Sequence, residues 1–183
     1  MKTTAKIISA LSVVAGLGVA ILPLSSYAAD STSRTKVTVT IGETLSIASN
    51  AGGNKNATIN NLTAADETMT EILTVTANKS GYKLTVKADN SQHMMHTDNV
   101  NKIEALTTDG TLTAGHWGLN ATNATAGVNG TQYKAVKTSP VDLVTVNTPV
   151  AGDVTNIKYG VFPASNQKSG SYSVDLTYTV TAN

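Results

Sequence analysis

The sequence predicts an all-β fold: a single antiparallel β-sandwich, Ig-like or jelly-roll-like in layout, with about 8–10 short strands. Apolar residues alternate with threonine, serine and lysine in several segments, which is the period-two pattern of half-buried strands. Turn-forming residues separate these segments about every 8–15 residues. No segment has the period of a long amphipathic helix, and only residues 62–69 suggest a short helical turn.

Residues 1–28 are typical of a bacterial signal peptide. Lys2 and Lys6 precede an uncharged, mostly apolar stretch over residues 7–22, and small residues stand at the −3 and −1 positions of a cleavage site after Ala28. We therefore expect an exported protein that lies outside the cytoplasm, at the cell surface or in the cell wall.

Composition and charge exclude several function classes for the rest of the chain, which we divide into a polar linker (29–35) and a β-sandwich domain (36–183). The absence of cysteine excludes disulfides, thiolate metal sites and a cysteine nucleophile. Loss of the two signal lysines changes the formal charge from +1 to −1, which argues against a nucleic-acid partner. No second apolar run reaches about 18 residues, so no membrane span is expected after signal cleavage.

The first strand of the domain is expected at Lys36–Ile41, where apolar and polar residues alternate strictly, and a short second strand is expected around residues 45–47. The best hairpin follows. Its strands are residues 71–77 and 82–88, and the turn Asn78–Gly81 ends in a glycine that is free to adopt a positive φ.

Weaker strand candidates follow a long polar loop expected at residues 89–102. They lie at residues 103–107, 116–120, 131–136 and 143–146. Two stronger strands close the chain, at residues 157–161 and 172–181, with a loop over residues 164–170 between them.

Three histidines form the candidate metal site. His93 and His96 are close in sequence, and His116 is the third imidazole that the fold could bring near them. Imidazole suits zinc or copper, so a metal-binding protein outside the cytoplasm is one alternative. A solvated polar loop explains the same residues, and we expect no cofactor.

The carboxylates Asp66, Glu67 and Glu71 are the only cluster that suggests acid–base chemistry. Glycosidases use paired carboxylates at a defined separation, whereas neighbours along an exposed segment are usually solvated surface charges. The sequence contains no nucleophile elbow, phosphate-binding loop or zinc-protease motif. We therefore expect that the protein is not an enzyme.

Trp117 is the single tryptophan, and we expect it to anchor the core of the domain rather than to stack on a sugar. It also opens a literal W-x-L sequence, Trp117-Gly118-Leu119. Near the C-terminus, the segment from Tyr172 to Val180 resembles a motif Y-x-x-x-L-T-W-x-L, with Tyr178 at the position of the tryptophan. In this order, the segments resemble the WxL domains of bacterial cell-surface proteins.

The resemblance implies a β-rich exported domain that is held non-covalently at the cell wall. Its partner would be peptidoglycan, or another envelope polysaccharide or protein. The wall-binding residues implied are those that match the two motifs: Trp117, Leu119, Tyr172, Leu176 and Tyr178. The expected function is therefore that of a non-enzymatic, threonine-rich adhesion or binding domain.

The sequence is also similar to disulfide-free fimbrial subunits, which begin and end with alternating strands of this kind. That similarity implies a structural subunit that assembles by strand exchange, with the strand at residues 36–41 completing the sheet of a neighbouring copy. Self-association through this strand is the second function that the sequence leaves open.

Overall fold

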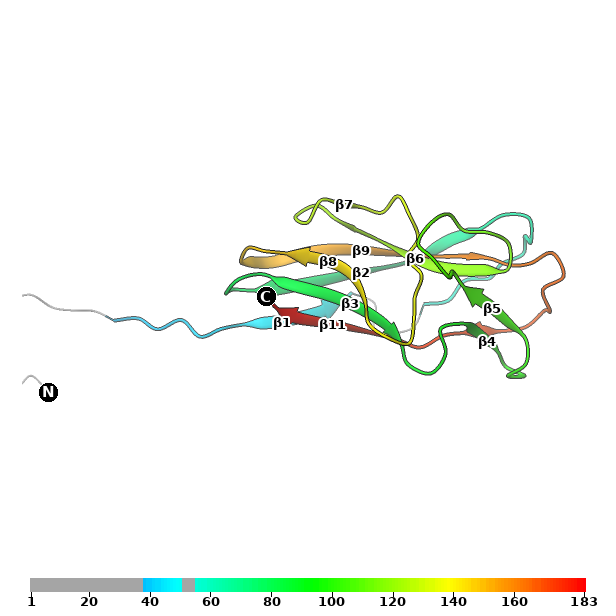
Figure 1. Ribbon diagram of the computed structural model, residues 1–183, viewed down its shortest axis with the longest axis horizontal. Coiled ribbons are helices and arrows are strands. Elements are labelled where there is room, and N and C mark those ends of the chain that lie inside the picture. The colour runs from blue at the N-terminus through cyan, green and yellow to red at the C-terminus, as the bar shows by residue number, and fades with distance from the viewer. Residues whose placement is uncertain (1–37, 51–54) are drawn as a thin grey trace, which may run out of the picture. The chain divides into compact units, whose positions relative to one another are not determined.

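The computed structural model describes residues 38–50 and 55–183. The predicted signal peptide and linker, together with Lys36 and Val37, lie outside the described residues. The described part contains eleven strands and no helix, and it confirms the all-β prediction (Figure 1). The strands are β1 (Leu45–Ser49), β2 (Asp66–Ala77), β3 (Tyr82–Ala88), β4 (Met94–His96), β5 (Lys102–Ala105), β6 (His116–Asn123), β7 (Val128–Asn129), β8 (Val141–Val146), β9 (Val150–Phe162), β10 (Tyr172–Ser173) and β11 (Leu176–Ala182).

The strands form two sheets. The larger sheet has the order β1-β2-β9-β6-β5-β4-β10, and β7 adds to β6. The smaller sheet has the order β11-β3-β8. All neighbours pair antiparallel except β5 and β6, which are parallel. The long strands β2 and β9 form the most extensive pairing and position the residues discussed below.

The main core lies between the inner faces of these sheets. Its largest fully buried side chains include Leu73 of β2, Tyr82 of β3, Trp117 and Leu119 of β6, and Ile157 of β9. Each comes from the apolar phase of an alternating strand, so the sequence pattern correctly identified the inward positions. Burial of each such side chain stabilises the fold by about 1.5–3 kcal/mol.

The predicted hairpin of β2 and β3 is wrong, although both strands exist. β2 pairs with β1 and β9, whereas β3 pairs with β11 and β8 in the other sheet. The turn before Gly81 therefore carries the chain across the core instead of folding it back within one sheet. Gly81 has φ = 102°, and a β-carbon there would lie 2.1 Å from the carbonyl oxygen of Val146. Because the chain crosses the core, the apolar faces of β2 and β3 can be buried against each other.

Five further expectations need correction. The single strand predicted at residues 172–181 is divided into β10 and β11, which belong to different sheets. The described part of the first predicted strand, residues 38–41, is not a strand, and residues 131–136 make only isolated bridges. The suggested helical turn at 62–69 is instead a bend that leads into β2, and the polar loop at 89–102 contains the short strand β4. In each case the pattern of alternation or polarity is present in the sequence. The structure differs because the segment either has no neighbouring strand in register or pairs with a strand that the pattern did not indicate.

A second, smaller apolar cluster covers part of the outer face of the larger sheet. It consists of Leu106, Leu112, Tyr133 and Ala135, with Phe162 packed against them. The Tyr133 ring lies on Gly160, where a β-carbon would come within 2.5 Å of the ring carbon Cε1. This glycine is therefore required for the close approach of the 130–136 segment to the sheet.

Candidate functional site

Trp117 and Leu119, the first two residues of the predicted wall-binding set, are fully buried in the main core. The indole Nε1–H of Trp117 donates a hydrogen bond to the carbonyl oxygen of Gln92 at 3.0 Å. The expectation that Trp117 anchors the core is thus confirmed. Neither side chain is exposed to a ligand in this structure.

Tyr172, Leu176 and Tyr178 lie on β10 and β11 and are half-buried. The Tyr172 ring packs 5.0 Å from the ring of His96, and its hydroxyl donates to the carbonyl oxygen of Lys168. Leu176 and Tyr178 stand opposite Ala88 and Val86 of β3, on its inward face. The five predicted residues are therefore distributed over β6, β10 and β11, in both sheets.

The three histidines each make local interactions. The His96 Nδ1 lies 2.9 Å from a carboxylate oxygen of Asp98, and His93 Nδ1 accepts a hydrogen bond from the Ala105 N–H at 3.2 Å. His116 Nδ1 lies 3.0 Å from the hydroxyl of Thr113. Burial, reinforced by Lys102, lowers the pKa of His93. Within residues 38–50 and 55–183, no three histidine, aspartate or glutamate side chains gather so that they could hold a metal ion.

Two polar clusters lie on the inner face of the larger sheet, and their members are paired with one another. In the first, Asn123 donates to Asp153 Oδ2 at 2.9 Å and to Thr155 Oγ1 at 2.9 Å. The Tyr82 hydroxyl donates to the same Asp153 oxygen at 2.6 Å. Burial, together with this carboxylate, raises the pKa of Tyr82 to about 12.

The second inner cluster joins the two sheets. The Tyr159 hydroxyl donates to Glu71 Oε2 at 2.6 Å and lies 2.8 Å from the Tyr178 hydroxyl. Ser49 of β1 donates to the other oxygen of Glu71. Burial and the neighbouring Tyr178 and Glu71 raise the pKa of Tyr159 above its usual range. These phenols are held neutral and act as structural links between the sheets.

A different arrangement occurs on the outer face, where β2, β9 and β6 form a shallow hollow of about 240 Å³. Two cross-strand rows of side chains line it. One row is Thr70, Lys158 and Asn120, and the next is Ile72, Asn156 and Thr122. We call these six residues the outer hollow. Each row takes one residue from each of the three strands, so the hollow combines hydroxyl, amide and ammonium groups with one aliphatic side chain.

Asn120 distinguishes the outer hollow from ordinary polar sheet surface. Its side chain is only 7% exposed, because the 129–134 segment borders β6 and Gly130 lies against it. Nevertheless, the amide makes no hydrogen bond with any residue in the described part of the chain. Among the described residues, only the Tyr133 hydroxyl is a fully buried side-chain polar atom without a partner, so the Asn120 amide is open to solvent at the hollow.

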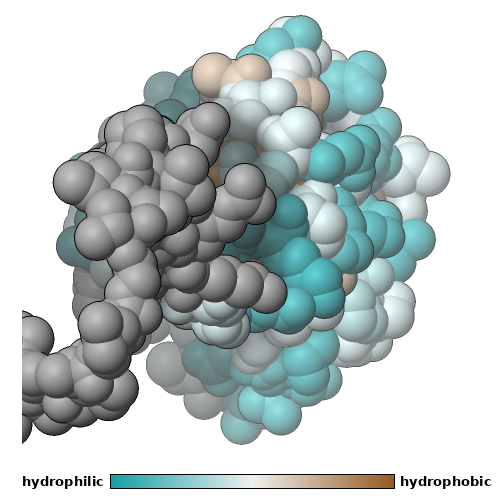
Figure 2. Space-filling view, turned by 90° about the vertical axis from the view of Figure 1, so that its left-hand side faces the viewer, coloured by the Kyte–Doolittle hydropathy of each residue, from teal (hydrophilic) through white to brown (hydrophobic). Residues whose placement is uncertain are grey.

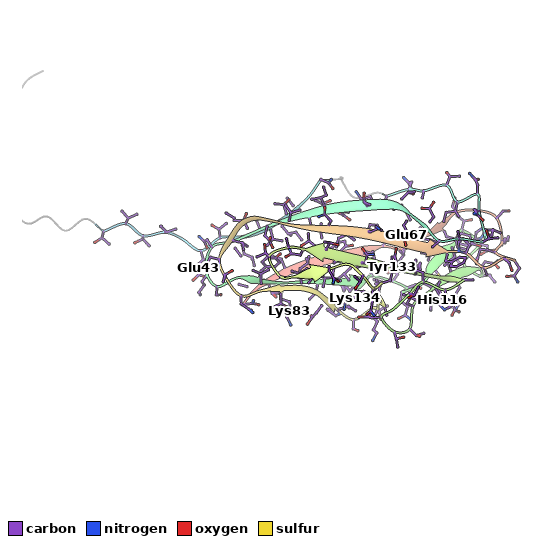
Figure 3. All side chains as sticks on the ribbon, turned by 90° about the horizontal axis from the view of Figure 1, so that it is seen from above. Glu43, Glu67, Lys83, His116, Tyr133 and Lys134 are labelled. Atoms are coloured by element: carbon purple, nitrogen blue, oxygen red, sulfur yellow. The ribbon has the colours of Figure 1, made fainter. Side chains whose placement is uncertain are left out.

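Glu67, Lys158 and Tyr133 lie at the border between the outer hollow and the smaller apolar cluster. Lys158 Nζ lies 3.3 Å from Glu67 Oε2, and both side chains are 43% exposed. Tyr133, with Lys158, holds the pKa of Glu67 below its usual value, so the carboxylate stays ionised (Figure 3). The Tyr133 hydroxyl is buried and lacks a hydrogen bond of regular geometry among the described residues. The lysine charge is therefore largely balanced before any ligand binds.

The outer hollow was not predicted from the sequence. Alternation along β9 already placed Asn156 and Lys158 opposite the inward Ile157, and this was the only available signal. The hollow exists because three strands from distant parts of the chain align in one register.

Comparison with known protein families found no matching family model, and no curated protein matches the chain either. The described part of the chain has no helix long and apolar enough to cross a membrane. The assignment of function therefore depends on the residues of this chain.

Proposed function

We propose that this is an exported, non-enzymatic bacterial surface protein that attaches to the cell envelope. Its β domain, a sandwich of Ig-like or jelly-roll-like layout, binds peptidoglycan or another envelope polysaccharide through the outer hollow. The signal-like N-terminus and the ordered WxL-like segments support export and attachment to the envelope. The amide of Asn120 carries the choice of surface, because it lines the outer hollow and makes no hydrogen bond within the described residues, so it is open to pair with a ligand group.

This proposal differs from the one that the resemblance implies in its contact residues. The W-x-L residues Trp117 and Leu119 are fully buried, so they support the sheet from within. Asn120 follows Leu119 directly and points to the opposite face of β6, because successive strand residues alternate in direction. The W-x-L segment thus supports the ligand surface without contacting the ligand.

The test is co-sedimentation of the mature protein with purified envelope fragments. We expect retention of the native protein, and at least a tenfold loss of affinity when Asn120 and Asn156 are both replaced by alanine. Asn90→Ala is the matched control, since Asn90 is exposed and lies outside the outer hollow. Equal retention of the double variant and the control would refute the assignment of this surface.

Strand exchange is the second candidate function, and one specific observation favours it. Residues 38–41 have alternating side chains but form no strand, and Val39 and Ile41 are 78% and 83% exposed. Among the described strands, β11 pairs with β3 alone, so its other backbone edge has no strand partner there. β1 lies beside β11, however, which reduces the room for an added strand.

Strand exchange and envelope binding predict different behaviour on a gel. A native envelope fraction is run on an SDS gel with and without heating and is probed for this protein. A ladder that collapses on heating would establish a strand-exchanged polymer. A monomer band in both lanes would favour the envelope-bound single domain. At the end where the chain enters β1, the described surface visible in Figure 2 is mostly hydrophilic or intermediate in hydropathy.

A further inference from the structure

We infer that Asn129 is a site of spontaneous deamidation, in which its side chain closes a succinimide ring with the backbone nitrogen of Gly130. Asn129 is the last residue of β7, the strand labelled at the top of Figure 1, and it is exposed. It is the only asparagine in the 183-residue sequence that directly precedes a glycine. The chemistry requires no enzyme, cofactor or ligand, so the modification itself is independent of the proposed function.

Hydrogen bonds fold the Asn129 side chain back over the peptide unit that follows it. Its Oδ1 accepts from the Thr131 N–H at 3.4 Å and from the Thr131 hydroxyl at 3.1 Å. The ring that the first of these bonds closes contains both Asn129 Cγ and the Gly130 nitrogen, which are the two atoms that must join. The two donors also withdraw electron density from the side-chain carbonyl, so Cγ becomes a better electrophile.

Gly130 is suited to supply the attacking nitrogen. Its N–H donates no hydrogen bond to any described residue, so the nitrogen is not held by another group. Glycine has no β-carbon that could obstruct the approach of Asn129 Cγ. Its φ of 63° lies in the left-handed region, which favours glycine at this position.

The reaction balances with water as its only co-reactant. Hydroxide from the solvent removes the Gly130 amide proton, the nitrogen bonds to Asn129 Cγ, and the bond from Cγ to the side-chain nitrogen breaks to release ammonia. Water then opens the ring at either carbonyl, which yields aspartate or isoaspartate. Both products replace a neutral amide with a carboxylate, and isoaspartate also adds a methylene group to the backbone.

The chain contains a matched control in the segment Asn61-Leu62-Thr63. Asn61 is also exposed, and its Oδ1 accepts from the Thr63 N–H at 2.8 Å and from the Thr63 hydroxyl at 2.7 Å. These contacts correspond to those of Asn129. The next residue is leucine, however, and its side chain hinders attack by the backbone nitrogen. A comparison of the two asparagines therefore isolates the effect of Gly130.

Deamidation of Asn129 changes the border of the outer hollow. Asn129 stands opposite Thr122 of β6, and a β-carbon on Gly130 would clash with the Thr122 hydroxyl and lie 3.5 Å from Asn120 Oδ1. An added methylene group therefore displaces backbone that packs against two residues of the hollow, and the new carboxylate places negative charge beside them. We expect weaker retention on envelope fragments, and this consequence alone rests on the proposed function.

The test is prolonged incubation of the folded mature protein in mildly alkaline buffer, followed by proteolysis and mass spectrometry. We expect the Asn129 peptide to gain the mass difference between a hydroxyl and an amino group at least tenfold faster than the Asn61 peptide does. Leu62→Gly should accelerate deamidation of Asn61 at least tenfold. Asn129→Gln should slow deamidation at that position at least tenfold, because the ring would be larger. Circular dichroism after incubation shows that each protein is still folded.

The outcomes separate the modification from the proposed function. Equal rates at the two asparagines, or an Asn129 that stays intact in the folded protein, would overturn the inference. Anion exchange separates the deamidated form, whose retention on envelope fragments is compared with that of fresh protein. Unchanged retention of the deamidated form would overturn the effect on the hollow while the modification site still stood. Failure of the fresh protein to be retained would instead overturn the proposed function and leave the deamidation unaffected.

Discussion

The two faces of the larger sheet differ in the hydrogen-bond pairing of their polar side chains. On the inner face, Asn123, Asp153 and Tyr82 are paired with one another, and so are Glu71 and Tyr159. On the outer face, the amide of Asn120 has no partner among the described residues, and the Tyr133 hydroxyl has none of regular geometry. The same three strands, β2, β6 and β9, contribute to both faces.

This difference separates structural groups from groups that are free to bind a ligand. A fully paired buried network stabilises one arrangement of the chain and offers nothing to a ligand. A polar group that has no partner within the chain but is open to solvent costs little stability and remains available to a ligand. The inner clusters should therefore determine stability, and the outer hollow should determine binding.

The largest expected effect is on the inner face, at Trp117. Replacing this fully buried side chain with alanine should lower the free energy of unfolding by about 3–5 kcal/mol, because it removes a large apolar group and leaves a cavity. Denaturant titration measures the loss, and Trp117→Phe should cost less because it preserves part of the packing. A loss below about 1 kcal/mol would mean that the core does not depend on this residue.

Asn123→Ala should have the next largest effect and should lower the free energy of unfolding by about 2–3 kcal/mol. The substitution removes a donor to Asp153 and to Thr155, and it also removes the acceptor for the Ala126 N–H, which lies 2.7 Å from Asn123 Oδ1. Chemical denaturation of the variant measures the change. A stability equal to that of the native protein would show that the inner network is no more essential than the outer hollow.

A smaller effect is expected from the ionisation of Tyr82. Its pKa is raised from 10.0 to about 12 in the folded protein, so the neutral phenol stabilises the fold. This contribution is fully present below the unfolded-state pKa and is lost as the pH rises through the folded-state value. The thermal unfolding midpoint should therefore fall between pH 10 and about pH 12.

Tyr82→Phe separates this contribution from that of the other phenols, since Tyr159 and Tyr178 also have raised pKa values. The variant should be less stable at neutral pH, where it lacks the hydrogen bond to Asp153, and its unfolding midpoint should depend less on alkaline pH. An unchanged alkaline profile would assign the titration to the cluster of Tyr159.

The inward and outward positions of most strands could be predicted from the sequence, because alternation is local. It placed Tyr82, Leu84 and Ile157 inside and Lys83 and Lys158 outside, and the apolar character of Trp117 predicted a core anchor. Alternation does not identify the neighbour of a strand. Both β2 and β3 have an apolar face and a turn between them, and this pattern fits a hairpin and a crossing between sheets equally well.

The outer hollow could not be predicted for the same reason. Ile72, Asn120 and Asn156 are separated by dozens of residues and meet only through the register of β2, β9 and β6. The burial of Asn120 also depends on the 129–134 segment, and the strand predicted at residues 131–136 forms only isolated bridges there, one of them to Leu119 of β6. The absence of a hydrogen-bond partner is a property of the assembled site and has no sequence signature.

The smallest expected effect on stability provides the sharpest test of the difference between the two faces. Asn120→Ala removes a buried side chain that makes no hydrogen bond in the described part of the chain, so no partner is left unpaired. The free energy of unfolding should therefore change by less than about 0.5 kcal/mol, although Asn120 is only 7% exposed. Denaturant titration of both alanine variants under identical conditions measures this contrast. If Asn120→Ala cost as much as Asn123→Ala, the amide would be structural, and a ligand would not be needed to explain its burial.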